Sequence, residues 1–133
     1  MNTRSYEAAL KSIERIAKPS AQIMEAKQKI LFQLGTQSFA NTNFEQALQY
    51  LNQSIAIGQY NRQTKADAYY WCGESYYRLN RMMEAARDFN AYLQLTTQPN
   101  NEMYALANYN LGYIAFHRKD YTCLLYTSDA ADD

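Results

Sequence analysis

The apolar residues of this chain recur at the spacing of amphipathic helices, and polar or helix-breaking residues separate the segments that they form. Pro19 stops the first segment, Ser20 can cap the second, and Gly58 is suited to end the third. The pattern predicts helices over residues 6–16, 21–40, 44–57, 63–79, 82–96 and 102–117, with a further helix that begins at Tyr121. Only four glycines and two prolines in 133 residues argue against disorder and against a β-rich fold. We therefore predict one all-α domain.

The same apolar pattern occurs several times along the chain, at a period of 38 or 39 residues. The recurring small positions, which we assign to repeat packing, are Gly35, Ala47, Gly73, Ala85 and Gly112, with Ala9 at the equivalent place near the N-terminus. An apolar residue follows each glycine by nine positions, as Phe44, Met82 and Tyr121. A glycine inside a helix costs about 1 kcal/mol relative to alanine, so a packing reason is expected for it. We interpret Gly73 as a site of close contact with Ala85 on the next helix.

These repeated columns resemble the tetratricopeptide repeat, over residues 3–121. The resemblance implies a right-handed α-solenoid of antiparallel helix hairpins. The family's usual period is about 34 residues, so units of 38 or 39 residues imply longer helices. Three features depart from the family pattern: Asn108 replaces a large residue, Tyr92 replaces a small one, and Gln59 and Thr97 stand where a closing proline is usual.

The resemblance divides residues 1–122 into parts of a repeat array. Residues 3–18 match the second helix of a truncated repeat, residues 20–58 and 62–97 match two complete repeats, and residues 101–122 match the first helix of another. Because the first unit lacks its first helix, we interpret Met1 as an internal methionine of a longer protein. The chain is then a fragment of a larger tetratricopeptide protein.

Residues 123–133 abandon the repeat pattern, and Leu124 stands where a small alanine is expected. Their sequence resembles one reading frame of a transposase sequencing adapter read through into the coding frame, which would make this tail non-native; the alternative is a natural frayed terminus. Without the tail's three aspartates, 10 acidic residues face 13 basic ones, a net charge of +3. An unfinished last repeat predicts an exposed apolar patch over Leu111, Ala115 and Tyr121, and end-to-end self-association of the chain.

The sequence offers little that could carry out chemistry. Without the tail, the chain has one cysteine, Cys72, and one histidine. These are too few ligands for a metal site. One cysteine also leaves the redox compartment open. His117 and Asp120 could touch on a helix, but no nucleophile accompanies them, and we interpret His117 as a surface residue. There is no glycine-rich phosphate loop, no basic stripe and no apolar run long enough to cross a membrane. We predict a protein that is not an enzyme, uses no cofactor and binds no nucleic acid.

What remains is a surface formed by the first helix of each hairpin. Aromatic residues stand three before and four after each glycine, with Thr36, Glu74 and Tyr113 between them. By the resemblance, this face lines a concave groove that binds a peptide or a partner helix, and the same aromatics could equally serve packing alone. The predicted groove residues are Phe32, Thr36, Phe39, Tyr70, Glu74, Tyr77, Arg78, Tyr109, Tyr113 and Phe116. Phe32 and Thr36 occupy the places of the residues that clamp chaperone C-terminal carboxylates, which disfavours that class of partner.

The sequence therefore predicts a protein–protein interaction scaffold. Two alternatives stay open: a structural solenoid spacer that binds nothing, and a regulatory array fused to a catalytic domain outside these residues. Residues 70–74, Tyr-Trp-Cys-Gly-Glu, are similar to a motif of periplasmic, Tol-Pal-associated and outer-membrane-assembly tetratricopeptide proteins. That similarity points to the Gram-negative cell envelope, and the cytoplasm remains an alternative.

Overall fold

The computed structural model describes the backbone of residues 3–129 and the side chains of residues 3–117. Helices make up this part of the chain, and it contains no strand, so the all-α prediction is confirmed. The elements are α1 (Thr3–Glu14), α2 (Ala21–Ala40), α3 (Phe44–Ile57), the 3-10 helix η1 (Gly58–Tyr60), α4 (Arg62–Arg78), α5 (Met82–Leu95) and α6 (Glu102–Asp129).

Side-chain caps explain where most of these helices begin. The Ser20 hydroxyl accepts the N–H of Ile23 at 3.2 Å at the start of α2, as predicted. Asn43 and Asn61 cap α3 and α4 in the same way, through their side-chain oxygens. Asn101, one of the two asparagines expected to cap the last helix, accepts a backbone N–H of α6 at 2.9 Å. The helix boundaries are thus set by local residues.

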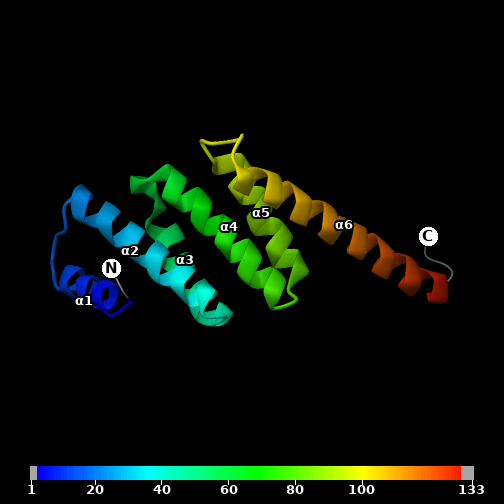
Figure 1. The fold of residues 1–133 in the computed structure, drawn as a ribbon, viewed down its shortest axis with the longest axis horizontal. Coiled ribbons are helices and arrows are strands. Elements are labelled where there is room, and N and C mark those ends of the chain that lie inside the picture. The colour runs from blue at the N-terminus through cyan, green and yellow to red at the C-terminus, as the bar shows by residue number, and fades with distance from the viewer. Residues whose placement is uncertain (1–2, 130–133) are drawn as a thin grey trace.

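Each described helix packs against the helix next to it in the chain. The most extensive contacts join α2 to α3 and α4 to α5, and each of these pairs is connected by a turn of three residues. Further contacts join α1 to α2, α3 to α4, α5 to α6 and α2 to α4. In Figure 1, α2, α4 and α6 all run from upper left to lower right, and the orange-to-red end of α6 extends past the other helices.

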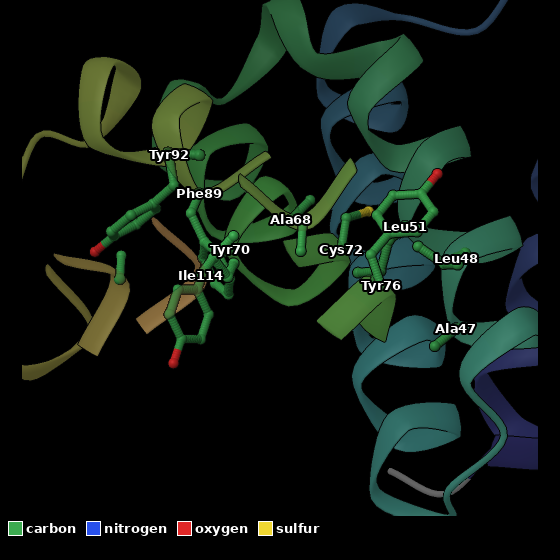
Figure 2. Packing of buried hydrophobic residues seen from close by; sticks show 13 residues of the cluster. Ala47, Leu48, Leu51, Ala68, Tyr70, Cys72, Tyr76, Phe89, Tyr92 and Ile114 are labelled. Carbon is green, nitrogen blue, oxygen red and sulfur yellow. The ribbon is translucent and has the colours of Figure 1, made fainter. Parts of the chain in front are cut away.

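The core runs through the middle of this arrangement. Its buried side chains come from α2 to α6, with Leu31 and Leu34 on α2. Figure 2 shows the cluster continuing from Ala47 and Leu48 to Phe89, Tyr92 and Ile114. The described residues of α1 include none that is buried, so this helix adds only partly covered side chains.

Two of the three repeat glycines are close-packing sites, although the residue nearest to Gly73 is not the predicted Ala85. A Cβ at Gly73 would lie 2.8 Å from Cδ1 of Phe89, and one at Gly35 would lie 2.5 Å from Cγ of Leu51. Ala85 is buried, but the atoms nearest to Gly73 belong to the larger residue one helical turn further on. The glycine therefore makes room for a bulky side chain rather than for a small one.

The last helix is longer than the sequence pattern predicted. A helix over residues 102–117 was expected to be followed by a turn and a new helix at Tyr121, whereas α6 continues without a break to Asp129. Residues 113–128 contain neither glycine nor proline, so no local signal ends the helix. The backbone of α6 also runs across the boundary that we predicted, between residues 122 and 123, where the repeat array meets the non-native tail. The side chains of Asp120 and Tyr121 lie outside the described residues.

Candidate functional site

Tyr70, a predicted groove residue, is a core residue instead. Its side chain is only 2 % exposed, and its ring meets those of Phe89 and Tyr92 on α5 at centroid distances of 5.6 and 5.5 Å. Figure 2 shows these rings gathered between α4 and α5. Burial, and then the hydrogen bond to Glu74, raise the pKa of Tyr70. The prediction that Tyr70 faces a partner is therefore wrong.

Glu74 connects α4 to α6 at the edge of this core. Its Oε2 accepts the Tyr70 hydroxyl at 2.8 Å and the side-chain amide of Asn110 at 3.0 Å. Both donors are neutral, and no ion pair of Glu74 occurs among the described side chains, so its negative charge remains at this surface. The structure thus fixes the position of a carboxylate beside the aromatic residues of α6.

Phe39 occupies the junction between α2 and α4. Its ring meets the edge of Trp71 at a centroid distance of 5.0 Å and that of Phe44 at 5.2 Å. The guanidinium of Arg78 lies 5.3 Å from the centre of the Phe39 ring, which is within the range of a cation–π interaction. Arg78 and Phe39, two of the predicted groove residues, therefore lie together, but the Phe39 ring is largely used in packing.

The aromatic residues of α6 are the most exposed of the predicted set. Tyr109, Tyr113 and Phe116 are 70, 43 and 62 % exposed, and their spacing of four and three residues places them on one side of the helix. Tyr77 of α4 lies against Tyr113, with ring centroids 6.0 Å apart. Partial burial, and then Tyr113, raise the pKa of Tyr77. We call Tyr77, Tyr109, Tyr113 and Phe116 the α4–α6 aromatic face.

The α2 end of the predicted groove is more covered than the α6 end. Phe32 is half-buried against the core, and the Thr36 hydroxyl donates to the backbone carbonyl of Gln33 at 3.1 Å. The predicted residues thus lie on three helices as expected, but exposed aromatic area is concentrated on α6.

Two residues of this region were not predicted. Trp71 packs edge-on against both Phe39 and Tyr70, and Asn110 binds Glu74. Both lie two positions before a repeat glycine, where the first repeat has Gln33. Because this position holds two carboxamides and one indole, the repeat pattern gives no consistent signal for Trp71.

The cysteine and the histidine among the described side chains are Cys72 and His117. Within them, no group of three or more His, Cys, Asp and Glu residues could hold a metal ion. The Cys72 thiol is buried, which raises its pKa, and its sulfur lies 3.8 Å from Oδ1 of Asn52. His117 lies beside Tyr113 and Phe116, with ring centroids 4.2 and 5.8 Å away and the ring planes tilted or nearly perpendicular. A search of the described helices found none that could span a membrane.

No protein-family model, curated protein or solved structure matches this chain. The resemblance to the tetratricopeptide repeat therefore rests on the internal repeat of the sequence.

Proposed function

We propose that this chain is a non-enzymatic protein-interaction module of the tetratricopeptide type. In this proposal its helix hairpins form a right-handed solenoid, and the α4–α6 aromatic face binds a peptide or a helix of another protein. The observation that supports it most is the distribution of exposed apolar side chains. Among the described residues, four of the six large hydrophobic side chains that are exposed lie on α6.

The geometry of the face suits a linear ligand. Tyr109, Tyr113 and Phe116 follow one line along α6, and a partner helix or extended peptide could contact them in succession. Aromatic side chains are favoured anchors because they bury a large, rigid area with little loss of conformational entropy. Glu74 and Arg78 would supply polar contacts at the edge, since Asn110 and Phe39 hold them in place. Such a polar edge would set the orientation of the ligand.

The spacer alternative has its own supporting observation. Phe39 and Tyr70 use their rings in packing, and Phe32 is half-buried, so part of the aromatic pattern serves the fold. A spacer would bind nothing at the remaining aromatics. The larger parent protein, a catalytic domain beyond these residues and a place in the cell envelope remain proposals from the sequence resemblance.

Peptide selection from a displayed random library tests the proposal. Fluorescence anisotropy would compare the selected peptides on the wild type, on Tyr113→Ser/Phe116→Ser and on Met83→Ser. Met83 is 61 % exposed and Phe116 is 62 % exposed, so Met83→Ser removes an apolar group as accessible as Phe116 at a different place. We expect the double variant to bind at least about tenfold more weakly, the effect of losing roughly 1.4 kcal/mol of contact energy.

The control Met83→Ser should bind as the wild type does, and far-UV circular dichroism should show that both variants stay helical. Failure to select any peptide, or equal binding by all three proteins, would favour the spacer. We also propose end-to-end association of copies through α6, because Gly112 lies in open space.

A further inference from the structure

The side of α6 that carries Gly112 lacks the cover that equivalent sides of α2 and α4 have. A Cβ added at Gly35 would lie 2.5 Å from Leu51, and one at Gly73 would lie 2.8 Å from Phe89. A Cβ added at Gly112 would meet nothing within 4 Å. Gly35 and Gly73 are buried and Gly112 is exposed. Gly112 therefore holds the repeat position of two packed glycines, but the face of α6 around it is uncovered among the described residues.

The last helix cannot cover this face by itself. The covering residue follows the glycine by 16 positions in both hairpins, as Leu51 after Gly35 and Phe89 after Gly73. Sixteen positions after Gly112 is position 128, which lies within α6 itself. Because α6 runs straight to Asp129, this position continues away along the same helix instead of returning over the glycine.

Helix α1 lies where a covering helix is expected, but it lacks a glycine-bearing face to cover. It packs on α2 as α3 packs on α4 and α5 on α6, so it holds the place of a covering helix. Its Ile13 stands 38 residues before Leu51, which stands 38 residues before Phe89. Leu51 and Phe89 are fully buried, whereas Ile13 is only half-buried. Leu51 and Phe89 already cover Gly35 and Gly73, so the described residues leave no such glycine for α1 to cover.

We propose that α1 of a second copy packs on the Gly112 face of α6, with its Ile13 over Gly112 as Leu51 lies over Gly35. This proposal deepens the end-to-end association suggested above by naming the second surface. The two surfaces differ, so each copy keeps one of them available and the copies join into open chains rather than closed pairs. Because α1 has only 12 residues, the interface is small and the association is weak and concentration-dependent.

Two variants block one end each. Gly112→Arg places a long charged side chain on the α6 face, and the monomer tolerates it because the position is open and arginine is a better helix former than glycine. Ile13→Glu places a charge on the α1 face. Gln49→Arg, at an exposed position of α3, is the control for added charge.

Sedimentation equilibrium over a range of concentrations measures the association of the wild type and the variants. The wild type and Gln49→Arg should show an average mass that rises with concentration beyond twice the 15.5 kDa monomer. Gly112→Arg and Ile13→Glu should each stay monomeric alone. Their equimolar mixture should form dimers and nothing larger, because it holds one intact α1 face and one intact α6 face per pair.

Other results overturn the proposal. Association of Ile13→Glu alone would mean that two α6 faces pair with each other, and association of Gly112→Arg alone would place the interface elsewhere. A wild type that stays monomeric at its highest soluble concentration, or a mixture that stays monomeric, excludes this pairing. Ile13→Glu changes no residue of the α4–α6 aromatic face and should bind the selected peptides as the wild type does, so failure of the peptide-binding proposal is distinguishable from failure of this one.

Discussion

Alanine substitution at Gly73 and at Gly112 should change stability in opposite directions. The new Cβ at Gly73 would lie 2.8 Å from Cδ1 and Cε1 of Phe89 and 3.0 Å from its Cγ. The Phe89 ring is fully buried and packs on Tyr70, so it has no open space into which to move. Overpacking of this kind costs about 1–3 kcal/mol, and the better helix propensity of alanine returns about 1 kcal/mol. Gly73→Ala should therefore lower the free energy of unfolding by up to about 2 kcal/mol.

The matched control is Gly112→Ala, which meets nothing within 4 Å and should raise the free energy of unfolding by up to about 1 kcal/mol. Gly73→Leu should destabilise more than Gly73→Ala because a longer side chain would push the two helices apart. Urea unfolding followed by far-UV circular dichroism, at low protein concentration, measures all three variants. The double variant Gly73→Ala/Phe89→Leu should lose less than the sum of its single changes. Equal midpoints for the two alanine variants would refute the close contact at Gly73.

Three further predictions concern single side chains. Burial raises the pKa of Asp88 despite the ion pair with Arg87, so the folded state binds the proton of the Asp88 carboxyl more tightly than the unfolded state does. The wild type should therefore gain stability relative to Asp88→Asn as the pH falls, and urea midpoints measured from pH 7 to pH 4 test this. The Cys72 thiol is buried with a raised pKa, so a thiol reagent should modify it, in a Cys123→Ser background, only as fast as the chain unfolds. Asn101→Ala removes the cap of α6 and should cost about 1 kcal/mol in thermal unfolding.

The sequence predicted the helices and their order well because the signals are local. The cap at Ser20 and the repeated glycines depend on residues close in the chain, and the structure has helix boundaries near the predicted ones. The contact partner of Gly73 was harder to predict. The repeat period indicates which residues of two helices lie opposite each other, but not how deeply their side chains interlock. The length of α6 was missed because the repeat pattern suggested a turn where no residue breaks the helix.

The candidate site was only partly predictable for a different reason. Tyr70 and Tyr109 occupy equivalent positions in the repeat, yet one is 2 % and the other 70 % exposed. The difference comes from their neighbours: Phe89 and Tyr92 of α5 pack on Tyr70, and no described helix follows α6. Periodicity identifies which side of a helix a residue occupies, but the tertiary neighbours decide whether that residue packs or is available to bind.

Photo-crosslinking tests the binding role of the α4–α6 aromatic face most directly. A benzophenone amino acid would replace Tyr113 in one protein and Met83, an exposed residue on α5, in another. Each would be irradiated with a library-selected peptide, and mass spectrometry would count the crosslinked product. Our account predicts a crosslink from position 113 that excess unlabelled peptide abolishes, and none above background from position 83. Crosslinking at position 83 alone, or equal crosslinking at both positions, would contradict it.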